Sequence, residues 1–214
     1  KSYKNKNILA KASRNDILEN KIYNKGFKSN YFKTWLSEKI LINNNKRVVS
    51  NLNNQVFKKR YFDFCFSIFS LNSSRDIPLA FKNIYNMLNT EGIFISVFPS
   101  DECLKEFSSY FIKFFHPAKN FNFNPLFDMQ TLGNLCSASG FKNVIVDKES
   151  FQLTITKPEE VWHFIRDIGE SNYLLKRKNF IVKKSLFKKF YNEYNKKLKE
   201  GDLKKNTLSI YYLI

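Results

Sequence analysis

Glycine is scarce in this sequence, with only six copies among 214 residues. They stand at positions 26, 92, 133, 140, 169 and 201, so no two lie within six residues of each other and no G-x-G triplet exists. Loops that bind nucleotides through backbone N–H groups depend on closely spaced glycines. The sequence therefore lacks the glycine-rich loop of the common nucleotide-binding folds.

Cysteine, histidine and long apolar runs are also sparse. The longest apolar runs, 64–68 and 93–98, are far shorter than the roughly 20 residues of a membrane-spanning helix. The three cysteines and two histidines are widely spaced, which predicts buried thiols and neither a disulfide framework nor a metal site. These residues are Cys65, Cys103, Cys136, His116 and His163.

Acidic residues are few, and the basic excess is unevenly distributed. The chain has 36 basic and 19 acidic residues, a net charge of +17. Residues 1–60 carry 15 basic and 3 acidic residues, residues 61–175 carry 9 and 13, and residues 176–214 carry 12 and 3. Basic flanks attract phosphate backbones or acidic lipids, although a solvated lysine surface is an equal alternative. The candidate contacts with RNA or a partner are Lys176, Arg177, Lys178, Lys184, Lys188, Lys189 and Lys196.

An apolar fraction of 43%, including 17% aromatic residues, is too high for a disordered chain. Hydrophobic periodicity predicts a basic, helical N-terminal segment over 1–46, with helices at 7–24 and 29–42, followed by an α/β domain over 47–214. Val48 and Val49 could begin a short strand. We expect further strands at 61–71, 93–98, 142–147, 151–156 and 207–213, and helices at 76–90, 102–115, 129–138, 158–168 and 184–199.

Several segments, in this order, carry a family resemblance. They are Phe62-Asp63, "DIPLAFKNIYNMLNTEGIFI" (76–95), "LGNLCSASGF" (132–141), "RDIGESN" (166–172, containing Gly169, Glu170, Ser171 and Asn172) and "LSIYYLI" (208–214). Together they resemble the class I S-adenosylmethionine-dependent methyltransferases. The branch concerned contains the mitochondrial complex I assembly-factor arginine hydroxylase and the malonyl-carrier-protein methyltransferase of biotin synthesis. The resemblance implies a Rossmann-like sheet and a mitochondrial location.

The sequence departs from that family where the cofactor should bind. Family members place a strand, a glycine-rich loop and a helix before the Phe-Asp strand, but only 19 residues separate Ile42 from Phe62. A single strand–helix–strand crossover needs at least a dozen residues, so we expect a degenerate or incomplete sheet and no cofactor. If S-adenosylmethionine does bind, through a segment outside these residues, the resemblance implies Asp63, Asn72 and Glu102 as site residues.

An incomplete sheet would leave the apolar strand 62–71 at an open edge, which is an aggregation hazard. We therefore expect a partner chain, or further residues of this chain, to cover strand 62–71. Three functions stay open. They are a non-catalytic subunit that contacts RNA or protein in a mitochondrial assembly such as the ribosome, an active S-adenosylmethionine-dependent enzyme, and an assembly factor that uses Gly169–Asn172.

Overall fold

The computed structural model describes residues 7–11, 30–35, 46–49, 53–54, 57–72, 74–115, 126–167 and 183–214. Contacts between Cα atoms divide the chain into two compact units. Unit 1 comprises residues 1–98, 128–147 and 211–214, and unit 2 comprises residues 99–127 and 148–210. Unit 1 therefore contains residues from both sides of the boundary expected at 46/47.

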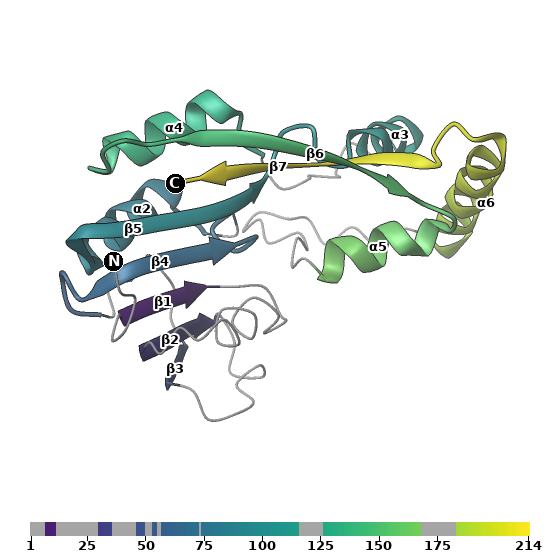
Figure 1. Ribbon diagram of the computed structural model, residues 1–214. Coiled ribbons are helices and arrows are strands. Elements are labelled where there is room, and N and C mark those ends of the chain that lie inside the picture. The colour runs from purple at the N-terminus through teal and green to yellow at the C-terminus, as the bar shows by residue number, and fades with distance from the viewer. Residues whose placement is uncertain are drawn as a thin grey trace. The chain divides into compact units, whose positions relative to one another are not determined.

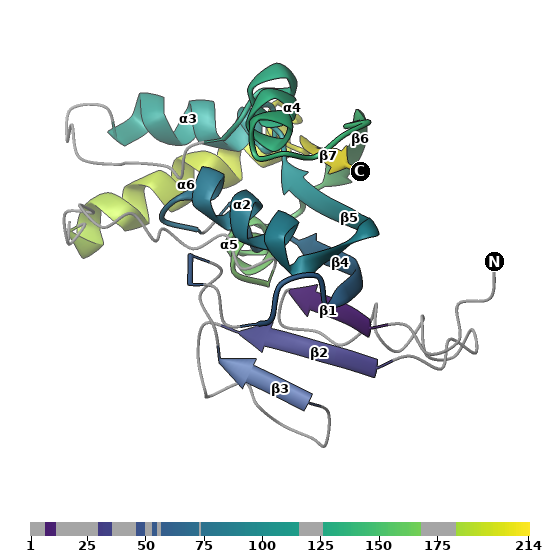
Figure 2. The same ribbon diagram turned by 90° about the vertical axis from the view of Figure 1, so that its left-hand side faces the viewer.

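Seven strands form one sheet in the order β3-β2-β1-β4-β5-β7-β6, as Figure 1 shows. β1, β2, β3, β4 and β5 pair in parallel, and their arrows run the same way in Figure 2. β7 runs opposite to its neighbours (Figure 1). The strands are β1 (Asn7–Lys11), β2 (Asn30–Trp35), β3 (Lys46–Val49), β4 (Phe62–Ile68), β5 (Leu88–Pro99), β6 (Val146–Thr154) and β7 (Lys205–Leu213).

The described helices are α2 (Ile77–Met87), α3 (Lys105–Phe115), α4 (Met129–Ala138), α5 (Pro158–Asp167) and α6 (Lys184–Glu200). All five were predicted from sequence within a few residues of these bounds. So were β4, β7 and the short strand at Val48-Val49, which is part of β3. β5 begins five residues earlier than expected, and the two strands predicted at 142–147 and 151–156 are one strand, β6.

The predicted helices at 7–24 and 29–42 are wrong in the described residues, because β1 and β2 occupy 7–11 and 30–35. Short apolar runs fit helices and strands equally well, and here pairing with a neighbouring strand decides. Ile8 and Leu9 of β1 lie opposite Phe64 and Cys65 of β4. The sheet is therefore not incomplete, and strand 62–68 is not an open edge. The reason for expecting a covering partner no longer holds, and a partner stays a prediction.

In unit 1, α2 packs on one face of β5. Phe81 is fully buried, and its ring lies 5.8 Å from that of Phe94 and 6.2 Å from that of Phe98. Ile93 and Ile95 alternate with these residues and are 43% and 39% exposed, so β5 is buried mainly on its α2 face.

α2 begins at a specific cap and contacts α4. The Asp76 carboxylate accepts a hydrogen bond from the backbone N–H of Leu79, and Pro78 lies in the first turn, where its missing N–H costs nothing. Near the end of α2, Tyr85 packs edge-on against Phe141 and directly against Gly140, two residues that follow α4. The φ angle of Gly140 is +109°. Only glycine adopts this conformation readily, so Gly140 ends α4 and leaves space for the Tyr85 ring.

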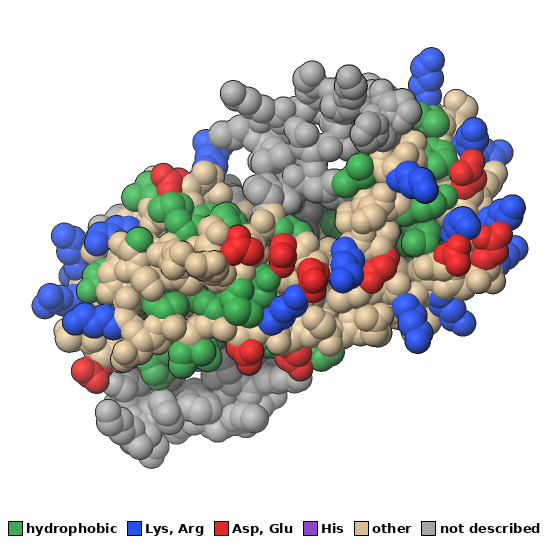
Figure 3. All heavy atoms as spheres, turned by 90° about the horizontal axis from the view of Figure 1, so that it is seen from above, with side chains coloured by type: hydrophobic (Ala, Val, Ile, Leu, Met, Phe, Trp, Pro, Cys, Tyr) green, Lys and Arg blue, Asp and Glu red, His purple; other side chains and the backbone are tan. Residues whose placement is uncertain are grey.

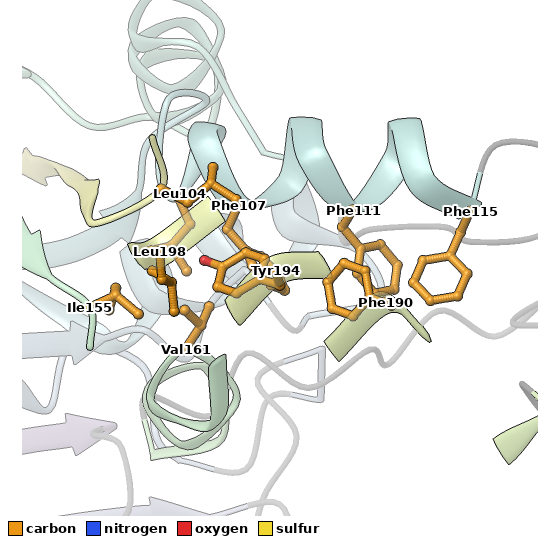
Figure 4. Close-up of a cluster of buried hydrophobic side chains, with 10 residues drawn as sticks. Leu104, Phe107, Phe111, Phe115, Ile155, Val161, Phe190, Tyr194 and Leu198 are labelled. Carbon is orange, nitrogen blue, oxygen red and sulfur yellow. The ribbon is translucent and has the colours of Figure 1, made fainter. Parts of the chain in front are cut away.

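Unit 2 has an aromatic core formed by α3, α5 and α6. In Figure 4, Phe107, Phe111 and Phe115 of α3 point toward Phe190 and Tyr194 of α6. The Phe190 ring lies 5.4 Å from Phe111 and 5.1 Å from Phe115. Burial raises the pKa of Tyr194 to about 12, against a smaller opposing effect of Asn206. The Phe111–Phe190 pair is edge-to-face, an arrangement that stabilises the core beyond the area it buries.

β6 and β7 are joined in each unit by backbone hydrogen bonds. In unit 1 the N–H groups of Ile145 and Ile214 each donate to the carbonyl of the other, at 2.8 and 2.9 Å. In unit 2 the Ile155 N–H donates to the Lys204 carbonyl at 2.8 Å. The paired residue numbers fall on one strand as they rise on the other, which makes the two strands antiparallel. Within the described part of the chain, no helix is both long and apolar enough to cross a bilayer.

Candidate functional site

The candidate site lies at the carboxyl ends of β1, β2 and β4 in unit 1. From β1 the chain continues to β2 on one side, and from β4 it continues to β5 on the other, so the strand order reverses between β1 and β4. Open parallel sheets bind ligands at the carboxyl ends of strands flanking such a reversal. β1 ends at Lys11, which lies opposite Ser67 of β4, and β2 ends at Trp35.

The sequence after β1 contains no glycine turn. A G-x-G-x-x-G turn that started directly after Lys11 would place its three glycines at Ala12, Arg14 and Ile17, and Gly26 is the first glycine of the chain. Such a turn needs glycine so that the backbone can approach the ligand and the helix can pack on the strand. The glycine-rich loop is therefore absent, but its place is after β1 and not between Ile42 and Phe62.

The end of β2 shows a second mismatch. In dinucleotide-binding sheets an acidic residue about 20 positions after the glycine turn binds the ribose hydroxyls. Here β2 ends in Trp35, and the next acidic residue is Glu38. No acidic residue therefore stands at the end of β2 itself.

Asp63, expected at the cofactor site if one exists, lies at the opposite edge of the sheet. It is the second residue of β4, and its carboxylate accepts hydrogen bonds from the Asn7 backbone N–H (2.9 Å) and the Asn89 side chain (3.1 Å). These contacts connect β1 and β5 to the amino end of β4. Ligands of such sheets bind at the carboxyl ends of the strands, so these contacts give Asp63 a structural role, and its expected cofactor role stays an untested prediction.

Asn72 does follow the carboxyl end of β4, where it is 5% exposed. The turn before it is held by buried hydroxyls, because Ser67 and Ser70 share a hydrogen bond of 2.7 Å and Ser96 donates to the Ser67 carbonyl. Phe69 has a φ of +44°, and its N–H donates to the Val97 carbonyl at 3.0 Å. A bulky residue in the left-handed region stores strain, so this turn is fixed by its surroundings.

Glu102 belongs to unit 2, and its carboxylate is already engaged. It accepts a hydrogen bond from Lys148 and lies 3.8 Å from the Lys105 ammonium. The hydrogen bond from Lys148, with the charge of Lys105, lowers the pKa of Glu102. A cofactor role for Glu102 stays an untested prediction, and any ligand would compete with two lysines for its carboxylate.

The predicted partner contacts are described only in part. Lys184, Lys188, Lys189 and Lys196 are exposed on α6. The cluster Lys176–Lys178 and the motif Gly169–Asn172 lie outside the described residues. On the face shown in Figure 3, basic and acidic side chains are interspersed. Among described residues, no group of three or more His, Cys, Asp or Glu side chains could hold a metal ion.

Two of the three predicted buried thiols are confirmed. Cys65 and Cys136 are 3% and 2% exposed, whereas Cys103 is only half-buried. Burial raises the pKa of the Cys136 thiol to about 12, which makes it a poor nucleophile and metal ligand near neutral pH.

The strands β1 and β2, whose carboxyl ends define the site, are not predicted from the sequence. The signal was the run Ile8-Leu9-Ala10, flanked by polar residues and followed 20 residues later by Tyr31-Phe32. A short apolar run and an aromatic pair are typical of buried parallel strands. Reading them as strands would have moved the expected position of the missing glycine turn from 43–61 to the residues that follow Lys11.

Known proteins similar in sequence are methyltransferases and their relatives. A Rickettsia prowazekii protein assigned as a methyltransferase is 28% identical over 157 residues, covering 71% of this chain and 68% of its own length. The zebrafish mitochondrial arginine-hydroxylase NDUFAF5 is 28% identical over 145 residues, covering 63% of this chain and 45% of its own. A malonyl-[acyl-carrier protein] O-methyltransferase of Halorhodospira halophila is 27% identical over 111 residues, covering 52% and 37%.

The chain thus spans about half or less of the hydroxylase and malonyl methyltransferase sequences that it matches. No family model matches the chain. Similar solved structures include a methyltransferase of Bacillus halodurans, with a TM-score of 0.60 at 11% identity, covering 98% of this chain and 90% of that one. A Haemonchus contortus phosphoethanolamine N-methyltransferase in complex with S-adenosyl-L-methionine gives a TM-score of 0.55 at 14% identity, covering 100% and 49%.

These likenesses confirm the predicted class I methyltransferase-like α/β fold, and the relatives fall in the branch that the sequence motifs indicated. In sequence and in fold, this chain is thus similar to the class I S-adenosylmethionine-dependent methyltransferases.

Proposed function

We propose that this chain is a methyltransferase-fold protein that does not bind S-adenosylmethionine and acts as a binding subunit. The observation that carries the proposal is the combination of a glycine-free segment after β1 with Trp35 at the end of β2. Cofactor affinity in such folds depends on both positions. A chain with neither has kept the sheet as a scaffold and lost the ligand site.

Titration of the purified chain with S-adenosylmethionine tests this proposal. A ligand at 100 times its Kd stabilises a protein by about 2.7 kcal/mol. For a chain of this size that corresponds to a rise in melting temperature of about 5 to 11 °C. We expect no shift and no heat by calorimetry at millimolar ligand, with an S-adenosylmethionine-binding relative as the positive control. Saturable binding at micromolar concentration would refute the proposal.

The sequence relatives support an alternative function, that of an enzyme or an assembly factor. Relatives of this chain include arginine hydroxylases and O-methyltransferases, so an active S-adenosylmethionine-dependent enzyme, or an assembly factor that works through Gly169–Asn172, is the alternative. Its cofactor would have to bind without a glycine turn. The variant Ala12→Gly, Arg14→Gly, Ile17→Gly, Trp35→Asp distinguishes the two. If only the variant binds cofactor, these four positions account for the loss.

The assembly that we propose is a mitochondrial ribonucleoprotein such as the mitochondrial ribosome. Two features support this: the basic excess of residues 176–214 and the mitochondrial location in the names of the arginine-hydroxylase relatives. Epitope-tagged chain should sediment with ribosomal particles from isolated mitochondria and move to the top of the gradient after nuclease treatment. Sedimentation that persists after RNA is digested would favour a purely protein partner.

A further inference from the structure

α6 of unit 2 has one apolar face and one basic face. The apolar face repeats every four residues and is buried, with Phe190 and Tyr194 fully inaccessible and Leu198 7% exposed. On the solvent side, lysines dominate. The exposed lysines of the helix are Lys184, Lys188, Lys189, Lys196 and Lys199.

The ion pairs of α6 lie at its carboxyl end, and Glu193 is the one acidic residue of the helix before Glu200. Lys197 lies 3.0 Å from Glu200 and 2.9 Å from Asp202, and the hydrogen bonds that it donates to the Asp202 and Glu200 carboxylates raise its pKa. Lys196 reaches Glu200 only at 3.9 Å and is 77% exposed. Within the described residues, no ion pair is found for the three lysines of the amino-terminal half, Lys184, Lys188 and Lys189. Positive charge therefore accumulates toward the amino end.

The helix dipole adds to that charge instead of opposing it. The first turn contains no acidic residue, and the N-cap, Lys183, makes no side-chain cap hydrogen bond. The free N–H groups of a first turn carry partial positive charge, and helices normally place acidic residues there. Lysines at this end are electrostatically unfavourable, and a bound anion would relieve the repulsion.

The packing of α6 distinguishes between anionic partners. A helix that binds a membrane surface inserts its apolar face below the lipid headgroups. In α6 the apolar side chains Phe190, Tyr194 and Leu198 are buried in the protein core and cannot insert into a membrane. Phe187 is 37% exposed, and a single partly packed ring is too little for insertion. Lysines on flexible stems act as point charges without a preferred geometry, which suits a repeating phosphate backbone. From Lys184 to Lys199 the helix spans about 22 Å, or roughly six nucleotides of one strand.

We propose that the lysine face of α6, formed by Lys184, Lys188, Lys189, Lys196 and Lys199, binds the phosphate backbone of RNA without sequence preference. The choice of RNA rests on the proposed function as a subunit of a ribonucleoprotein, whereas the position of the surface rests on the charges and packing of α6 alone.

The salt dependence of RNA binding tests the proposal. Fluorescence anisotropy with a labelled RNA duplex and a single strand gives log K against log salt concentration, and each lost phosphate contact lowers the slope by about 0.7 to 0.9. The variant K184Q/K188Q/K189Q should lower the slope by about 2 to 3 and weaken binding at least tenfold at low salt. The control K113Q/K142Q/K157Q removes the same charge from exposed lysines elsewhere and should change the slope little.

Each outcome has a distinct meaning, provided that both variants melt like the wild type. An unchanged slope for the α6 variant, with RNA still bound by the wild type, overturns the α6 surface but leaves the proposed function intact. Equal losses in both variants also overturn it, because net charge alone would then explain binding. Failure of the wild type to bind RNA at low salt removes the proposed ribonucleoprotein role. Binding to phosphatidylserine vesicles that is lost in the α6 variant, without RNA binding, would assign the surface to membranes.

Discussion

The two units bury their side chains in different ways. Unit 1 stacks a helix on parallel strands, and Phe81 of α2 meets Phe94 and Phe98 on alternate positions of β5. Unit 2 interlocks rings from helices that are far apart in sequence, with α3, α5 and α6 contributing to one cluster. The first arrangement is fixed by strand pairing and helix caps, whereas the second depends on how rings fit together. The candidate site, at the carboxyl ends of β1, β2 and β4, lies in unit 1. The lysines of α6 without a described ion pair lie in unit 2.

Deleting one ring from each unit gives the largest expected effect. Phe190→Ala removes a buried ring within 6.2 Å of six others, so we expect a loss near the top of the range of about 3–5 kcal/mol for such truncations. Phe81→Ala, which loses two ring contacts, should lie near the lower end. Hydrogen exchange should locate each loss in its own unit. Equal loss of protection in both units would mean that they unfold as one.

Asp63 tests the amino edge of unit 1. Asp63→Ala leaves the Asn7 N–H and the Asn89 amide without their acceptor, and we expect a loss of about 1–3 kcal/mol. Asp63→Asn keeps the shape and one acceptor oxygen, so it should lose less. Urea denaturation measures both variants. If Asp63→Ala were as stable as the wild type, β1 would be held to β4 by backbone pairing alone.

In unit 2, the carboxylate of Glu106 holds the start of β7 through Thr207, as Asp63 holds β1 and β5 in unit 1. Its carboxylate accepts hydrogen bonds from the Thr207 N–H (2.9 Å) and hydroxyl (2.6 Å). Burial alone would raise the pKa of Glu106, but these hydrogen bonds outweigh burial and lower it below 4.5. A lowered folded-state pKa means that this stabilisation is complete above about pH 4.5 and is lost as the pH falls through the lower, folded-state value.

Glu106→Gln should therefore destabilise the protein by roughly 1 kcal/mol at pH 7 and less at pH 3. Denaturation midpoints of variant and wild type, measured between pH 3 and 7, check this convergence. A difference that is constant over the whole range would mean that the Glu106 charge does not contribute.

The helix cap of α2 gives the smallest expected effect. Asp76→Ala removes the acceptor for the Leu79 N–H and should cost about 1 kcal/mol, while Asp76→Asn should be nearly neutral. Thermal denaturation, with hydrogen exchange at the start of α2, measures both. A loss of similar size in Asp76→Asn would show that the charge of Asp76 matters more than its capping oxygen.

The five described helices, β4 and β7 could be predicted because local patterns sufficed. Asp76 with Pro78 marks the start of α2, and Gly140 and Gly201 end α4 and α6. The candidate site could be predicted only in part. The absence of a glycine turn was readable, but its position was not, because Ile8-Leu9-Ala10 is too short to distinguish a strand from a helix.

By itself, the sequence determined the α/β class, the apolar faces of the described helices, the missing glycines and the basic excess near α6, because each of these depends on residues close together in the chain. Only the tertiary structure decided that Asn7–Lys11 and Asn30–Trp35 are strands, that Asp63 lies at the amino edge of the sheet and that Lys197 pairs with Glu200 and Asp202. The strands and Asp63 depend on partners many residues away, and the Lys197 pairs depend on side-chain geometry at the end of α6. Neither kind of contact is set by local propensity.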